Sequence, residues 1–233
     1  MLKAGRKITR ITVAYEAGRD GFWLARWLRV RGVEAHVIHP SSVAVSREQR
    51  RAKTDRLDTG LLKRSFLGWL RGETNHCSMA AIPTLAEEDA KRPNRERQSL
   101  VSERTRIINR LKSTMARLGI RGFKPTLRRA LQQLEGLRTP DGEPVPPNTL
   151  AELQRDMVRL RLIKDQINAI EMARERQLAA APEHGPHPMV RLLAKVMGIG
   201  IETADMLVHE VLSRDLRDRR AVGALCRPDR FAG

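Results

Sequence analysis

The sequence is poor in aromatic side chains, in cysteine and in long apolar runs. Aromatic residues make up 3% of the 233 residues, which argues against a platform on which unpaired bases stack. The two cysteines, Cys77 and Cys226, are far apart and match no metal-ligand spacing, so we expect ordinary thiols in a reducing compartment. No stretch approaches the roughly 20 apolar residues that a membrane span needs, and none resembles a signal peptide. The sequence therefore predicts a cytoplasmic protein with no membrane partner.

Negative charge is also scarce relative to positive charge. The chain has 44 Lys and Arg against 27 Asp and Glu, a formal net charge of +17, and the basic residues are spread along its whole length. A distributed excess of this size favours a polyanionic partner, most simply DNA or RNA, because protein cations that neutralise phosphates release condensed counterions. A basic surface that serves only solubility is the alternative.

The first seventy residues have the pattern of an α/β unit. Residues 8–14 alternate and are rich in Ile, Val and Thr, as in a strand, residues 22–30 have helical periodicity, and residues 33–38 read as a second strand. Strand, helix and strand within about thirty residues predict a parallel pair. Residues 55–70 follow as a helix, with Leu at spacings of three and four.

This last helix opens with two aspartates, Asp55 and Asp58, whose spacing places both carboxylates on one face, close enough to share a metal ion. Capping is the alternative, because acids in a first helical turn are favoured by the helix dipole. Glu16, at the end of the first strand, offers a third carboxylate that could converge on the same ion. The basic residues around the aspartates are Arg47, Arg50, Arg51, Lys53 and Arg56.

Two long charged helices are predicted next, over residues 94–118 and 149–178, each with a narrow apolar stripe. Such stripes are typical of a coiled coil, formed within one chain or between two. A shorter helix is expected over residues 126–137, and the proline-rich residues 139–147 form a loop.

The last segment follows a linker at residues 181–188. Gly198-Ile199-Gly200 lies between two apolar helical stretches and resembles a helix-hairpin-helix turn, in which glycines let backbone N–H groups approach a phosphate. An ordinary turn between packed helices is the alternative. His184, His187 and His209 are expected to be linker or surface residues rather than ligands.

These motifs, in this order, resemble the DEDD transposases of bacterial insertion sequences, recombinases that work with an element-encoded bridge RNA. The most specific part is Lys53-Thr54-Asp55-Arg56-Leu57-Asp58. The resemblance implies an α/β plus α fold: a partial RNase H-like (RuvC-like) domain at residues 1–75, a helical coiled-coil region at 76–180 and the start of a C-terminal transposase domain at 189–233. The apolar stripes themselves lead us to expect a homo-oligomer held by the coiled coil, with pairing within one chain as the alternative.

The resemblance further implies that Glu16, Asp55 and Asp58 are catalytic residues that bind Mg²⁺. Arg47, Arg50, Arg51, Lys53 and Arg56, with Gly198 and Gly200 at the turn, would contact DNA or the guide RNA. The family's first aspartate lies upstream of its glutamate, and no acidic residue precedes Glu16 here. The family's nucleophilic serine would lie beyond Gly233, and Ser213 does not match its motif.

We therefore expect a chain truncated at both ends, inactive alone, and either poorly soluble or reliant on a partner chain. Three functions stay open: a transposase, a nucleic-acid-binding remnant without catalysis, and a RuvC-like nuclease selective for DNA structure.

Overall fold

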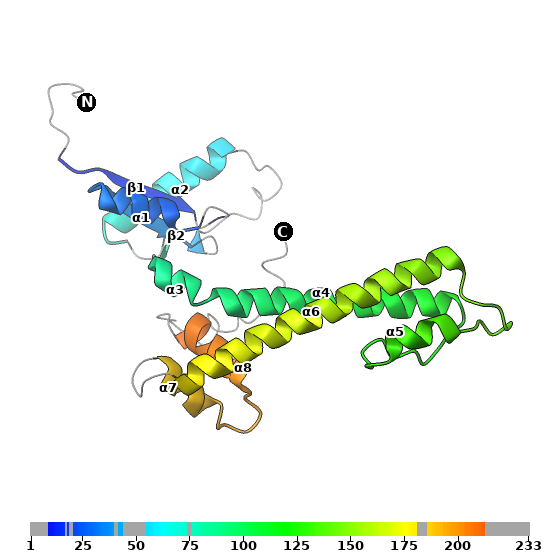
Figure 1. Cartoon of the computed structure of the whole chain (residues 1–233). Helices are drawn as coiled ribbons and strands as arrows, with labels where there is room; N and C mark the ends of the chain where they lie inside the picture. The colour runs from blue at the N-terminus through cyan, green and yellow to red at the C-terminus, as the bar shows by residue number, and fades with distance from the viewer. Residues whose placement is uncertain are drawn as a thin grey trace. The chain divides into compact units, whose positions relative to one another are not determined.

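The computed structural model divides into two compact units, residues 1–89 and 90–233 (Figure 1). It describes residues 9–16, 18, 21–39, 42–43, 55–73, 76–180 and 186–212, without the side chains of residues 55–58. No described helix is long and apolar enough to cross a membrane.

The first unit contains a three-stranded sheet in the order β1-β2-β3. Strand β1 (Thr12–Glu16) runs parallel to β2 (Glu34–Ile38), in a register that pairs Thr12 with Glu34 and Glu16 with Ile38. The two-residue strand β3 (Met79–Ala80) is antiparallel to β2. The predicted parallel pair is thus confirmed. Strand β1 covers Thr12–Glu16 rather than the expected residues 8–14, because these five residues are the ones that pair with the five residues of β2.

Helix α1 (Trp23–Val30) connects the parallel strands and covers a small core. Its buried members are Ala25, Ala35, Val37 and Ala80. The hydroxyl of Tyr15 donates to the carbonyl of Gly21 at 3.1 Å and accepts from the backbone N–H of Ala25 at 3.2 Å. One side chain of β1 therefore fixes where α1 begins. Helix α3 (Leu85–Asp89) is tied to α1 by the Arg26–Glu88 ion pair, at 2.8 Å.

In the second unit, helices α4 (Arg92–Arg117) and α6 (Pro147–Ala180) lie side by side and antiparallel (Figure 1). The buried residues of their seam include Ile107, Leu111 and Met115 from α4 and Leu153, Met157, Leu160, Ile163 and Ile167 from α6. Both predicted apolar stripes therefore face each other within one chain, which was one of the two alternatives for the coiled coil.

A buried carboxylate crosses this seam. Asp156 is 2% exposed and receives two hydrogen bonds from the guanidinium of Arg110, both at 2.6 Å. Arg159, one turn further along α6, adds a contact at 3.1 Å. The hydrogen bonds from Arg110 hold the pKa of Asp156 below its ordinary value although burial opposes this. Because the pair is bidentate, it fixes the register of α4 against α6 as well as adding stability.

One end of the hairpin is closed by residues 118–146. The helix expected at residues 126–137 is shorter: α5 spans Ala130–Gln133 and continues as a single 3₁₀ turn, η3 (Leu134–Gly136). Residues 125–129 instead form turns, with Pro125 at their start. Ala130 and Leu134 are fully buried and attach this segment to the seam.

The other end of the hairpin carries three short helical elements. They are α7 (Pro186–Leu193), α8 (Ile201–Met206) and the π-helical turn η4 (Leu207–Leu212). Val190, Ala204 and Val208 pack on Leu178 near the end of α6 in a small apolar cluster.

We expect Asp156→Asn to lower the free energy of unfolding by about 1–3 kcal/mol, because Arg110 then loses its charged partner at a buried site. Urea unfolding followed by helical circular dichroism measures the change. Since the folded pKa lies below the ordinary 3.8, the contribution of Asp156 is present above that pH and is lost as the pH falls through the lowered value. Asp165→Asn, at an exposed site on the same helix, should have almost no effect; equal losses for the two variants would contradict this role.

Gly119 provides a second prediction. Its φ is +73°, and an added Cβ would lie 2.6 Å from Cγ of Pro140. We expect Gly119→Ala to cost about 1–3 kcal/mol, from left-handed backbone strain and the clash together. Gly136→Ala is the matched control, since its Cβ would meet nothing within 4 Å. Equal midpoints of urea unfolding for the two variants would show that the loop yields without cost.

Candidate functional site

Glu16 is the one predicted metal ligand whose side chain the structure describes. It is the last residue of β1, is exposed, and pairs in register with Ile38, the last residue of β2. The carboxyl ends of the parallel strands thus meet at this edge, which is where α/β sheets place their ligands. No described residue forms a hydrogen bond or ion pair with the Glu16 carboxylate. Among the described residues, therefore, none occupies this carboxylate.

Asp55 and Asp58 lie in the first turn of α2 (Asp55–Leu70), which begins at the residue that the sequence predicted. Their side chains, and that of Arg56, are outside the described atoms. Arg47, Arg50, Arg51 and Lys53 also lie outside the described residues. Among the side chains that the structure does place, no three His, Cys, Asp or Glu come close enough to hold a metal ion. Convergence of Glu16 with the two aspartates stays a prediction.

The C-terminal half of α2 is what attaches this helix to the sheet. The ring of His36 on β2 lies 5.5 Å from that of Phe66 and 5.0 Å from that of Trp69, between centroids. Nε2 of His36 is buried without a hydrogen-bond partner, and burial lowers the pKa of this residue, so the neutral ring is favoured. His36 therefore acts as an aromatic packing residue.

The turn predicted to resemble a helix-hairpin-helix lies between α7 and α8. Gly198 has a φ of +86°, which favours glycine, whereas Gly200 is the N-cap of α8 with ordinary dihedrals, and a Cβ there would meet nothing. The first turn of α8 contains Glu202, whose carboxylate is already bonded to Arg97 and Arg174. Binding of phosphate by this turn stays a prediction, and only Gly198 has a conformational reason to be glycine.

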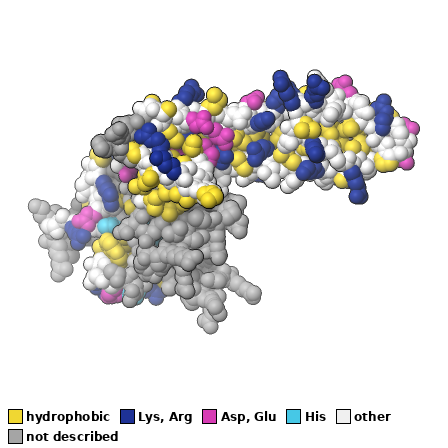
Figure 2. Space-filling view, turned by 90° about the horizontal axis from the view of Figure 1, so that it is seen from below, with side chains coloured by type: hydrophobic (Ala, Val, Ile, Leu, Met, Phe, Trp, Pro, Cys, Tyr) yellow, Lys and Arg dark blue, Asp and Glu magenta, His cyan; other side chains and the backbone are white. Residues whose placement is uncertain are grey.

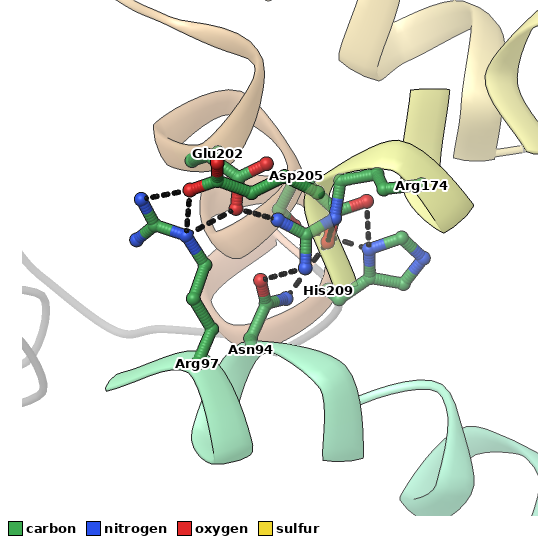
Figure 3. Close-up of polar contacts among 7 residues, drawn as sticks. Asn94, Arg97, Arg174, Glu202, Asp205 and His209 are labelled. Atoms are coloured by element: carbon green, nitrogen blue, oxygen red, sulfur yellow. Dashed lines mark hydrogen bonds and ion pairs between the residues drawn. The ribbon is translucent and has the colours of Figure 1, made fainter. Parts of the chain in front are cut away.

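A cluster of buried and half-buried polar side chains, which was not predicted from the sequence, joins α4, α6 and α8 (Figure 3). Arg174 is 5% exposed at its centre and bonds to Glu202, to Oδ1 of Asn94 at 2.7 Å and to Oδ2 of Asp205 at 3.3 Å. Asn94 donates back to Oδ2 of Asp205 at 2.8 Å. These bonds attach the C-terminal helices to both long helices.

Arg97 extends the cluster along α4. It contacts Glu171 at 2.7 Å and Glu202 at 2.9 Å. Three carboxylates, those of Glu171, Glu202 and Asp205, thus share two guanidiniums. A protonated His209 would add a third positive charge to the cluster.

Nδ1 of His209 lies 3.3 Å from Oδ1 of Asp205, one helical turn away. The hydrogen bond to Asp205 raises the pKa of His209 although burial opposes this. Burial alone would raise the pKa of Asp205, but bonds from His209 and Asn94 and the charge of Arg174 together hold it below its ordinary value. The expectation that His209 is a linker or surface residue is therefore wrong, because its ring is half-buried in a charged cluster.

Spacing was the available signal for part of this cluster. Glu202, Asp205 and His209 are separated by three and four residues, so they share a face of α8 and η4. Their partners on α4 and α6 are 28 to 111 residues distant, and no local pattern indicates such pairs. The cluster holds no arrangement for nucleophilic chemistry, and its role is to position the C-terminal helices.

We expect the docking of residues 201–212 to depend on pH through His209. Because its folded pKa is raised, the stabilisation is complete below the ordinary value near 6.5 and is lost as the pH rises through the folded value. The other ionisable groups around it are Arg174, His187, whose ring centroid is 6.4 Å away, and the Arg95–Glu210 pair.

Hydrogen–deuterium exchange of residues 201–212 measures the effect in the wild type and in His209→Gln. The protection that the variant loses should be largest in mild acid, about 1 kcal/mol or fivefold, and should shrink as the pH rises. His76→Gln, at an exposed ion pair with Glu73 in the first unit, is the control. A loss that is constant with pH, or that grows, would contradict a protonated His209.

The chain has an extensive similarity to one curated protein. It is 42% identical over 228 residues to a protein of Sinorhizobium fredii named "Putative transposase y4rJ", and the match covers 95% of this chain. The chain spans 57% of the length of that relative. No protein-family model and no solved structure matches. The chain is thus, over nearly its whole length, a relative of a protein named as a transposase.

Proposed function

We propose that this chain is a DNA transposase of a bacterial insertion sequence, of the DEDD type, whose first unit is an RNase H-like domain. The observation that carries the proposal is the 42% identity over 95% of the chain to the protein named as a transposase. The proposal gives the excess of positive charge a specific partner, DNA.

The geometry of the first unit supports an acidic site at the carboxyl edge of the sheet. Glu16 ends β1 there and is exposed, and α2 begins at Asp55 with Asp58 one turn further on. The carboxyl edge of parallel strands is the usual place for a site in such a sheet. In this proposal the three acids act together, with Asp55 and Asp58 as a pair on one helical face.

An all-oxygen ligand set of this kind fits Mg²⁺ better than a transition metal. Bound there, the ion would orient an oxygen nucleophile and neutralise charge at the phosphorus. The protein contributes the placement of the ligands: β1 fixes Glu16, and the contacts of Phe66 and Trp69 with His36 hold α2 on the sheet.

The basic residues that precede and enter α2 complete the proposal. Arg47, Arg50, Arg51, Lys53 and Arg56 would neutralise the phosphates of the nucleic acid brought to the acids. A guide RNA is a second proposed ligand of these residues, on the resemblance to the bridge-RNA recombinases.

We also propose that the chain self-associates, but through a surface other than the apolar stripes of the coiled coil. The buried stripes of α4 and α6 already fill each other within one chain. A second copy would therefore contact the outward face of α6, where Val158 and Leu162, one turn apart, are 59% and 57% exposed.

Cleavage of supercoiled plasmid and junction DNA by the purified chain, with Mg²⁺ and the RNA that flanks the gene, tests the acidic site. We expect Asp55→Asn and Asp58→Asn each to reduce metal-dependent cleavage at least ~100-fold, since a metal ligand supports several kcal/mol of transition-state stabilisation. Asp165→Asn is a control with the same chemical change at an exposed position of α6.

Each other result of the cleavage assay would favour a different function for this chain. Cleavage that survives both substitutions would reject the acidic site. Salt-sensitive DNA binding without any cleavage would favour a binding protein without catalysis. Cleavage of junctions without strand exchange would favour a nuclease selective for DNA structure.

A further inference from the structure

The closed end of the α4–α6 hairpin is strongly basic. Between Arg117 and Arg138 the chain has six cationic residues and one acid, Glu135. We call this segment the tip surface. The cations, all exposed, are Arg117, Arg121, Lys124, Arg128, Arg129 and Arg138.

None of these six cations forms an ion pair with a described carboxylate. The arginines at the other end of the hairpin do: Arg95, Arg97 and Arg174 bond to glutamates and to Asp205. Arg110, in the middle, bonds to Asp156. Within the tip surface, Arg117 donates only to its neighbour Thr114 and Arg138 to a backbone carbonyl. The described ion pairs of this hairpin therefore lie in its middle and at its other end, and none of them involves the tip cations.

The backbone of the tip surface is held in place. Gly119 and Gly122 adopt φ of +73° and +80°, and Gly119 lies directly against Pro140 of the following loop. Ala130 and Leu134 are fully buried beneath it. The cations thus extend from a fixed frame, so ordering them on a ligand costs side-chain entropy but little backbone entropy.

A shallow groove of about 580 Å³ opens on this surface. Its apolar lining includes Ile120, Phe123 and Leu127, and Arg121 and Lys124 also line it. Cations next to an apolar groove suit a ligand that alternates charged and uncharged parts, as phosphate alternates with sugar in a nucleic-acid backbone. Figure 2 shows dark-blue Lys and Arg side chains standing out from the hairpin arm on the right of the view.

We propose that the tip surface is a second, sequence-independent binding site for the phosphodiester backbone of duplex DNA, distinct from the acids of the first unit. The identification of the ligand as DNA rests on the proposed function, whereas the charge and the groove of the tip surface are independent of it. Asp141 and Glu143 lie in the next loop and form no described ion pair with the tip cations. Four of its exposed cations define the test.

The tip variant of the full chain changes four residues to glutamine: Arg121, Lys124, Arg128 and Arg129. Its matched control removes the same charge from exposed residues elsewhere in the second unit that have no ion pair to a described carboxylate: Arg161, Lys164, Arg176 and Lys195. Fluorescence anisotropy with a 30-base-pair duplex of arbitrary sequence, at several salt concentrations, gives the slope of log Kobs against log salt. Each lost phosphate contact reduces that slope by ~0.9.

We expect the tip variant to reduce the slope by up to about 3.6 and to weaken binding at least tenfold at moderate salt, with a slope change below ~1 for the control. A variant with lysine at Arg121, Arg128 and Arg129 should keep the wild-type slope, which guards against a folding defect. Equal slopes for the tip variant and the control would overturn the proposal, because net charge alone would then explain binding. So would a loss of binding to structured RNA with duplex binding unchanged.

The result is independent of the cleavage test. If Asp55→Asn leaves cleavage unchanged but the tip variant loses its salt-dependent contacts, the acidic site is rejected and the tip surface stands. If the reverse holds, the tip surface is rejected and the acidic site stands.

Discussion

Leucine and isoleucine side chains of α4 and α6 fill the space between these two helices along most of their shared length, with Leu111 and Leu153 almost completely shielded from water. Everything else in the second unit is attached to this seam. Asp156 and Arg110 cross it and exclude neighbouring registers, because a shift of one turn would bury the carboxylate without its guanidinium. Since such an unpaired buried charge is costly, the seam has one favourable alignment.

That alignment decides how charge is distributed at the two ends of the hairpin. At one end Arg174 would be an isolated buried cation, and Asn94, Glu202 and Asp205 converge on it from three elements. At the other end the cations of the tip surface are exposed and form no ion pair with a described carboxylate. The same residue type therefore holds the fold together at one end and is available to a ligand at the other.

Local patterns predicted the elements that depend on local physics. The strand–helix–strand unit, the start of α2 at Asp55 and the two long helices follow from periodicity, capping and the shortness of the connections. The helix expected at residues 126–137 was too long because apolar periodicity persists there while Pro125 and the buried contacts of Ala130 restrict the helical part. Arg174 and His209 were missed for another reason: their environments are made by residues far away in the chain. The acidic site could be predicted only in part from local patterns. Spacing places Asp55 and Asp58 on one helical face, but it says nothing about their distance from Glu16.

Helix α6 has 34 residues, which at 1.5 Å per residue makes a rod about 51 Å long. Along B-form DNA that length corresponds to about 15 base pairs, one and a half turns of the duplex. Because Asp156 fixes the register of α4 on α6, the rod cannot slide or shorten. The two ends of the hairpin are therefore held at a constant separation, and a ligand at the closed end would stay a fixed distance from the C-terminal helices.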